Sequence, residues 1–266
     1  MKQLHSISEI IRVFPTGDKP VLVICNDLNE WVCKYRDAQK LANELVASEF
    51  AKIWGIKMPQ TALVKISQSH IPVGKFPNLN YQLFQKECFG TIYLADSKEI
   101  DKATLPMFKE KGFANRIKDR EDFLKIALFD IWLANEDRNH NNFNLLIHSN
   151  AFYAIDHTHI FNTNSWENGM SQLTEEDSII KTNLAEILFK KSGNLRAAVD
   201  ILSDKFYLYC QECENRIDEI GNLLPESWLI NREEYKRKMR STIFSNDWKR
   251  NCEDNFKTLI NIFLEK

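Results

Sequence analysis

The segment DIWLANEDRNHNNFNLLIHSNAFYAIDHTH, residues 130–159, contains the pattern that decides the fold. Within it, two strand-like apolar runs at 143–147 and 151–155 are separated by the turn-forming residues 148–150, which predicts a tight hairpin. The preceding stretch, 121–134, is apolar on nearly every side of a helix and is expected to lie in a core. A surface loop does not usually stand between so apolar a helix and so apolar a hairpin. The polar residues between them are therefore expected to have a function.

Three oxygen-bearing side chains are expected to converge at one end of this hairpin. Asn142 precedes the first strand and Asp156 follows the second, while Asp137 stands five residues before Asn142. Phosphoryl transfer requires such a set, because the protein must supply magnesium ligands, positioning and a proton acceptor. Asp156 and Asn142 offer the hard oxygen ligands that Mg²⁺ prefers, and Asp137 can orient or deprotonate the attacking hydroxyl. Arg138 can steady the loop or a phosphate. The segment predicts the metal-and-phosphate centre of an ATP-dependent phosphotransferase.

A lysine and a glutamate upstream complete this prediction. Lys34 is a lone charge in the strand-like run WVCKY, which is an unusual place for a lysine. Glu44 follows ten residues later on an amphipathic helix predicted over 37–54. Protein kinases use a strand lysine paired with a helix carboxylate to hold the α and β phosphates of ATP. We therefore predict that Lys34 and Glu44 form such a pair.

Two further segments are candidates for contacts with the nucleotide. The turn at 15–20 stands where a phosphate-covering loop would be, although it has a single glycine. An ordinary hairpin turn is the equal alternative there. Backbone groups near the last strand of the first lobe are expected to recognise adenine. The residues predicted to bind the nucleotide in these two segments are Thr16, Gly17, Gln85, Glu87 and Cys88.

The order of periodic segments predicts an α+β fold in which a small sheet with one helix precedes a mainly helical part. Residues 1–90 are expected to form an N-lobe with a small antiparallel sheet and one helix, and residues 91–266 a mainly helical C-lobe. The expected strands of the N-lobe are 10–14, 21–25, 31–35, 61–66 and 81–90. The expected helices after the hairpin are 182–192, 194–222, 231–244 and 246–265.

Composition excludes several other classes of protein. The 266 residues include 35 Lys and Arg against 37 Asp and Glu, so a nucleic-acid protein with a basic face is not expected. Neither a signal peptide nor a run of eighteen apolar residues is visible, which indicates a soluble, cytoplasmic protein without a membrane span. The six cysteines are expected to be reduced thiols. Cys210 and Cys213 make one C-x-x-C without a second ligand pair, which is weak evidence for zinc.

The chain resembles the HipA-like kinases, especially the compact HipA-like kinase domains of bacteria, and more distantly the phosphoinositide kinases. The resemblance covers most of the chain and is carried by KPVLV (19–23), EWVCKY (30–35), LANELVASEFAKIWGIKMP (41–59), DIWLANEDRNHNN (130–142), AIDHTHIF (154–161) and LLPESWL (223–229). It implies a bilobal kinase that binds ATP and Mg²⁺ between its lobes and phosphorylates a Ser or Thr of a protein. Relatives include toxins, which implies a small antitoxin-like partner. Where phosphoinositide kinases read D-R-H, this chain has Asp137-Arg138-Asn139, with His140 one place later.

Three alternatives remain open from the sequence. His140, His148, His157 and His159 accompany the two aspartates and could recruit a transition metal for hydrolysis. A pseudokinase would keep the fold and bind a nucleotide or a partner without transfer. A phosphoinositide-type lipid kinase would use the same centre on a different acceptor.

Overall fold

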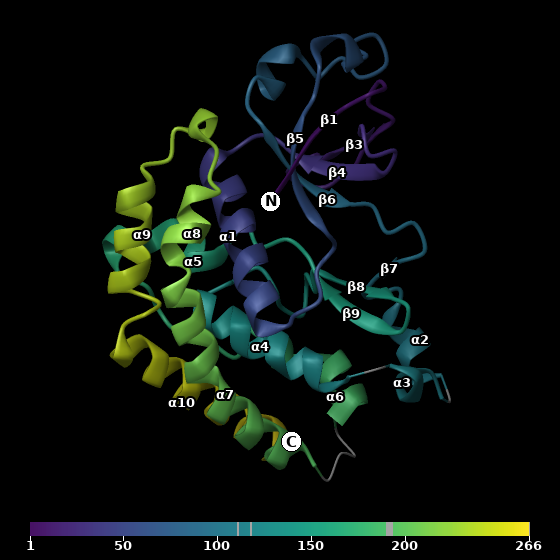
Figure 1. The fold of residues 1–266 in the computed structure, drawn as a ribbon. Coiled ribbons are helices and arrows are strands. Elements are labelled where there is room, and N and C mark those ends of the chain that lie inside the picture. The colour runs from purple at the N-terminus through teal and green to yellow at the C-terminus, as the bar shows by residue number, and fades with distance from the viewer. Residues whose placement is uncertain (111, 118, 190–193, 266) are drawn as a thin grey trace.

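The first lobe is built on a six-stranded sheet. The computed structural model describes residues 1–110, 112–117, 119–189 and 194–265 (Figure 1). The strands, in spatial order, are β1 (Lys2–His5), β5 (Thr61–Lys65), β6 (Cys88–Ile92), β4 (Glu30–Lys34), β3 (Val21–Ile24) and β2 (Arg12–Val13). Neighbouring strands are antiparallel except β1 and β5, which are parallel. The antiparallel sheet expected for the N-lobe is thus extended by one parallel edge strand that the sequence pattern did not reveal.

Helix α1 (Ala38–Trp54) follows β4 and lies between the six-stranded sheet and the helices of the second lobe (Figure 1). The Asp37 carboxylate caps its N-terminus by accepting from the backbone N–H groups of Gln39 and Lys40 at 2.9 and 3.1 Å. Gly55 ends it in the left-handed region with φ 65°. The predicted helix over 37–54 is therefore confirmed, with its caps.

The second lobe surrounds α4 (Glu121–Leu133), whose apolar side chains are almost all buried. Beside it, β7 (Lys98–Glu99), β8 (Leu145–His148) and β9 (Ala151–Ala154) form a three-stranded antiparallel sheet. Ser149 and Asn150 join β8 to β9 with φ 51° and 62°, the left-handed pair that a two-residue hairpin turn needs. The predicted buried helix and hairpin are both confirmed.

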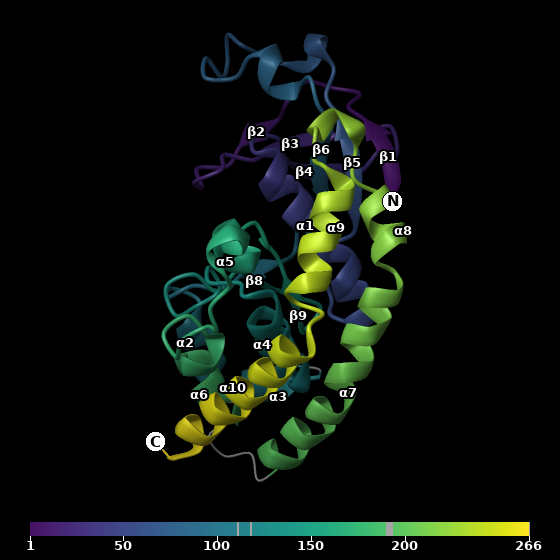
Figure 2. The same cartoon turned by 90° about the vertical axis from the view of Figure 1, so that its left-hand side faces the viewer.

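Helices make up the rest of this lobe. In both views α8 and α9 lie beside α1 and reach the level of the six-stranded sheet (Figure 1 and Figure 2). The helices are α2 (Leu105–Lys109), α3 (Phe113–Arg116), α5 (Ile160–Asn164), α6 (Asn183–Phe189), α7 (Leu195–Asn215), α8 (Ile217–Asn222), α9 (Arg232–Ser241) and α10 (Asn246–Glu265). Within α5, the residues 161–164 have φ between 45° and 68°, so this segment is a left-handed turn. None of the helices in the described ranges has the length and apolar character that crossing a membrane requires.

Several predicted boundaries are corrected by the structure. The strand expected at 10–14 is only β2, and the one expected at 81–90 is a 3₁₀ helix, Tyr81–Phe84, followed by β6. The 3₁₀ turn buries the Phe84 ring against Tyr35, with ring centroids 4.5 Å apart, which a strand in that place would not do. The helix expected at 194–222 breaks at Arg216 into α7 and α8. Residues 190–192 of the helix expected at 182–192 lie outside the described residues.

Candidate active site

Asp137 lies in the loop between α4 and β8, where two asparagines hold its side chain. Its Oδ2 accepts from the Nδ2 of Asn142 at 3.0 Å and from the Nδ2 of Asn144 at 3.2 Å. The carbonyl oxygen of Asn144 also accepts the N–H of Ile155 at 3.0 Å, one residue before Asp156. The hairpin therefore connects Asp137 to the strand end that carries Asp156. Asn144 was not predicted from the sequence, where it reads as one more loop amide.

Lys34 joins three parts of the molecule at one point. Its Nζ lies 2.5 Å from Oε1 of Glu44 on α1 and 2.8 Å from Oδ1 of Asp156 after β9. The Glu44 side chain is 3% exposed and that of Asp156 is 31% exposed, so one partner faces the protein interior and the other faces open space. The predicted pairing of Lys34 with Glu44 is present, and the structure adds Asp156 to it.

Burial and charge shift the pKa values of this trio in different directions. Burial raises the pKa of the Glu44 carboxyl above its usual value, although Lys34 opposes the shift. Burial also acts on Asp156, but the Lys34 ammonium outweighs it and holds the pKa of Asp156 well below its usual value. The hydroxyl of Thr158 donates to the same Asp156 oxygen at 2.7 Å and supports the ionised form. Despite burial, the two carboxylates raise the pKa of Lys34, so the lysine is a permanent cation here.

Arg138 fixes the loop from inside the protein. Its fully buried guanidinium forms an ion pair with Asp130 on α4 and donates to the carbonyl oxygen of Ile155 at 2.6 Å. The Nε2 atom of His157 lies 3.1 Å away, and burial and this guanidinium hold the pKa of His157 well below its usual value. Of the two roles considered for Arg138, the structure supports the loop and not a direct phosphate contact.

A buried asparagine links α1 to the segment after Asp156. Asn43, next to Glu44, donates from Nδ2 to the Thr158 carbonyl oxygen at 2.9 Å and to Oδ1 of Asn164 at 3.0 Å. Its Oδ1 accepts from the hydroxyl of Tyr235 on α9 at 2.8 Å. These three partners lie more than 100 residues away in the chain, so no local sequence signal could have identified the contacts with them.

The residues predicted in the phosphate-covering turn lie at the Lys34 end of the sheet. Val21 pairs with Cys33 in β3 and β4, which places the turn at 15–20 beside the end of β4. The hydroxyl of Tyr35 donates to the carbonyl oxygen of Lys19 at 3.1 Å and ties the turn to that end. Thr16 and Gly17 are exposed within it.

The residues predicted to recognise adenine lie at the start of β6. Cys88 is fully buried, the Glu87 carbonyl oxygen accepts from the indole N–H of Trp228 at 2.7 Å, and the Glu87 carboxylate accepts from Ser227. Gln85 lies in the preceding loop and is exposed. The chain leaves the six-stranded sheet after the other end of β6, at 93–97. Residues 93–97 thus connect the six-stranded sheet to β7 of the three-stranded sheet.

The four histidines do not converge on one point. His148 stands at the turn of the hairpin, whereas Asp156 follows the opposite end of β9. His157 faces Arg138, and His140 lies 3.9 Å from Glu176. In the described part of the chain there is no group of three or more His, Cys, Asp or Glu side chains placed to hold a metal ion. The six cysteines are buried free thiols, as expected.

The oxygens of Asp156 and Asn142 fit a magnesium ion chemically. Oδ1 of Asp156 contacts Lys34 and Thr158, while no described residue hydrogen-bonds to its Oδ2. Likewise, Asn142 uses its amide nitrogen on Asp137, and no described residue occupies its amide oxygen. A carboxylate and an amide oxygen are the donor types that Mg²⁺ takes in phosphotransferases.

Comparison with known proteins gives a family and a fold. The family model for the HipA-like kinases matches residues 7–260. The crystal structure of the Helicobacter pylori proinflammatory kinase CtkA superposes with a TM-score of 0.55 and 13% identity, covering 98% of this chain and 99% of that one. This likeness confirms the predicted α+β bilobal fold. No curated protein sequence matches the chain. The match over nearly the whole chain and the kinase fold lead to one conclusion: the chain belongs to the HipA-like kinase family.

Proposed function

We propose that this kinase transfers the γ-phosphate of ATP, with Mg²⁺, to a Ser or Thr hydroxyl of a protein. The observation that carries the proposal is the position of Lys34, whose ammonium joins Glu44 of α1 to Asp156 beyond the hairpin. A cation with one buried carboxylate and one partly exposed carboxylate can exchange the exposed partner for a phosphate. The Glu44 contact then keeps the lysine in place.

Each polar residue of the site takes one part of the reaction. Lys34 neutralises the α and β phosphates, and Glu44 orients it. Asp156 and Asn142 would hold Mg²⁺, which supplies positive charge beside the phosphate oxygens. Asp137 receives the acceptor hydroxyl through the carboxylate that Asn142 and Asn144 hold in place.

The transfer step is a single displacement at the γ-phosphorus. The acceptor oxygen forms a bond to the γ-phosphorus while the bond to the β–γ bridging oxygen breaks, and ADP leaves with that electron pair. The hydroxyl proton passes to the Asp137 carboxylate and then to solvent. Asp137 is suited to this role because its partners donate to one oxygen, Oδ2, and leave Oδ1 for the incoming hydroxyl.

The phosphates of the nucleotide are proposed to lie at the Lys34 end of the N-lobe sheet, next to the start of β6. The turn with Thr16 and Gly17 would cover its phosphates. For adenine we favour backbone groups of 93–96, because the lobes are joined there and the Glu87 carbonyl oxygen is already used by Trp228. Gln85 and Cys88 remain the second choice, through their backbone groups only.

The biological setting is proposed from the family. Relatives that act as toxins suggest that this kinase acts in the cytoplasm on a host protein and is restrained by a small antitoxin-like partner. Direct binding of nucleic acid is not part of the proposal, because the formal charge of the chain is −2.

Labelling with radioactive ATP tests the proposal. Wild-type protein, Asp137→Ala and Asp156→Ala would be incubated with γ-labelled ATP, MgCl₂ and a soluble extract. Asp200→Ala, an exposed carboxylate on α7, is the matched control. We expect labelled protein with the wild type and the control, and a loss of at least about a hundredfold with the two site variants.

Each other result has a definite meaning. Labelled phospholipid instead of protein would indicate the lipid-kinase alternative. ATP binding without any transfer would indicate a pseudokinase. Equal labelling by the wild type and both site variants would refute the assigned site.

A further inference from the structure

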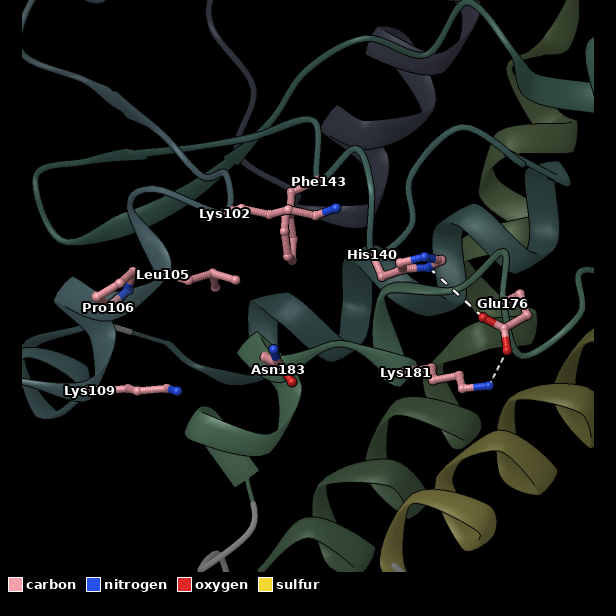
Figure 3. Close-up of a pocket in the computed structure, with 9 residues that line it drawn as sticks. All are labelled: Lys102, Leu105, Pro106, Lys109, His140, Phe143, Glu176, Lys181 and Asn183. Atoms are coloured by element: carbon pink, nitrogen blue, oxygen red, sulfur yellow. Dashed lines mark hydrogen bonds and ion pairs between the residues drawn. The ribbon is translucent and has the colours of Figure 1, made fainter.

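A pocket of about 460 Å³ opens directly beside the loop that carries Asp137 (Figure 3). Two residues of that loop line it: His140, three residues after Asp137, and Phe143, which follows Asn142. The opposite walls come from α2 and from the segment before α6. The pocket therefore adjoins the loop that carries Asp137 through two of the loop's residues.

The charge around this pocket is unbalanced. Three lysines line it, Lys102, Lys109 and Lys181, against one carboxylate, Glu176. Lys181 is paired with that carboxylate, which also faces His140. Figure 3 shows these three side chains in a row on one side, with Lys109 on the other.

The remaining two lysines are available for a negative ligand. Lys102 donates to the amide oxygen of Asn141 at 3.2 Å. Among the described residues, neither Lys102 nor Lys109 has an acidic partner. The two ammonium groups are thus uncompensated at the edge of a concave site, which favours an anion there.

Apolar side chains form the rest of the lining. Leu105 and Pro106 of α2 and the buried ring of Phe143 contribute to it. A free inorganic anion would gain nothing from this apolar surface. A polypeptide segment with a carboxylate near an apolar side chain would use both.

We propose that this pocket docks the acceptor protein through an acidic segment that flanks the phosphorylated hydroxyl. The inference rests on the proposed kinase function and adds the class of substrate to it. Lys102 and Lys109 contact the acidic side chains, and an apolar neighbour packs on Leu105 and Phe143. Since Phe143 directly follows Asn142, a segment seated in the pocket runs past Asp137. His140 is then a wall residue on the acceptor side, anchored through Glu176.

Peptide phosphorylation tests this inference. The probes are two Ser peptides of equal length, one with Glu and one with Lys at the positions that flank the serine. They would be assayed with γ-labelled ATP and MgCl₂ against the wild type and the double variant Lys102→Glu with Lys109→Glu. The control is Lys65→Glu with Lys205→Glu, which makes the same charge change at two exposed lysines outside the pocket. Urea unfolding of each protein checks that it is folded.

The expected result is a reversal of charge preference. The wild type and the control should phosphorylate the Glu peptide about tenfold more efficiently than the Lys peptide, as two exposed ion pairs together would give. The Lys102→Glu, Lys109→Glu variant should lose this preference through KM and turn toward the Lys peptide. A folding defect would lower the phosphorylation of both peptides together and could not reverse the preference between them.

The opposing results separate the two proposals. If the wild type labels both peptides equally, or if the pocket variant keeps the Glu preference, the docking site is refuted while the kinase function stands. If no protein or peptide is labelled under any condition, the kinase function fails and the docking proposal falls with it.

Discussion

Replacing Lys34 by methionine should destabilise the protein in a pH-dependent way. The change removes the ammonium that lies 2.5 Å from a 3% exposed Glu44 side chain and leaves this carboxylate buried without a countercharge. Breaking a buried ion pair from one side typically costs about 3–5 kcal/mol. Loss of the Asp156 contact adds to this penalty, because Lys34 is the group that holds the pKa of Asp156 below its usual value.

The pH dependence gives the magnitude a second check. In Lys34→Met the buried Glu44 must take up a proton, while the unfolded chain releases it with a pKa of about 4.3. At about pH 7 this uptake costs about 4 kcal/mol, since each pH unit above the unfolded pKa adds about 1.4 kcal/mol. The folded state binds the proton and the unfolded state does not, so the penalty must shrink as the pH falls. At about pH 5 it should be only about 1 kcal/mol.

Urea unfolding at several pH values measures this penalty. Lys40→Met is the matched control, because Lys40 pairs with Asp18 at 3.3 Å and both side chains are about a third exposed. This variant should lose at most about 1 kcal/mol of unfolding free energy, and the loss should not vary with pH in this range. Adding Glu44→Gln to Lys34→Met should recover more than half of the lost stability at neutral pH. A penalty in Lys34→Met that is the same at all these pH values, or no penalty at all, would refute the assignment of Glu44 as a buried carboxylate that depends on Lys34.

Three other substitutions test the framework around the site. Asn43→Ala should lower the free energy of unfolding by about 1–3 kcal/mol, because it leaves the Tyr235 hydroxyl without its acceptor. Tyr235→Phe should lower the free energy of unfolding by less, and urea unfolding measures both changes. Arg138→Met should lower the free energy of unfolding by about 3–5 kcal/mol, because it leaves the buried Asp130 carboxylate on α4 without its cation. Thermal unfolding measures this loss, and a melting temperature equal to that of the wild type would contradict it. Gly90→Ala should lower the free energy of unfolding by about 1–3 kcal/mol, because the new Cβ would lie 2.7 Å from Cγ2 of Val64 in the centre of the sheet. An unchanged urea midpoint would contradict this expectation.

The parts of the fold that could be predicted are those with local signals. Asp37 and Gly55 mark both ends of α1 in the sequence, and the turn at 148–150 marks the hairpin. Strand β1 carried no such signal, because it is a four-residue edge strand whose partner β5 lies about 60 residues away. The stretch at 81–90 misled the prediction because its apolar residues first form a 3₁₀ turn, in which only Phe84 is buried, and then a strand.

Some residues of the candidate site could likewise be identified from the sequence, and others could not. Charged residues with distinctive neighbours, such as Lys34 in an apolar strand, could be identified from the sequence and then found in contact with Glu44 and Asp156. Asn43 and Asn144 could not, because neutral amides are common and their role depends on partners brought together only by folding. The position of the lobe junction also depended on the order of strands in the sheet, which no local pattern gives.

The left-handed turn at 161–164 has an energetic consequence for the segment after Asp156. Four consecutive residues that are not glycine have φ of 62°, 45°, 54° and 68°. Each such residue typically costs about 1–2 kcal/mol relative to an ordinary backbone conformation. Contacts such as that of Asn164 with Asn43 must outweigh this cost, so the turn depends on the rest of the protein for its conformation. A partner that displaced those contacts would let the segment relax, and this relaxation would return only part of the free energy lost with the contacts.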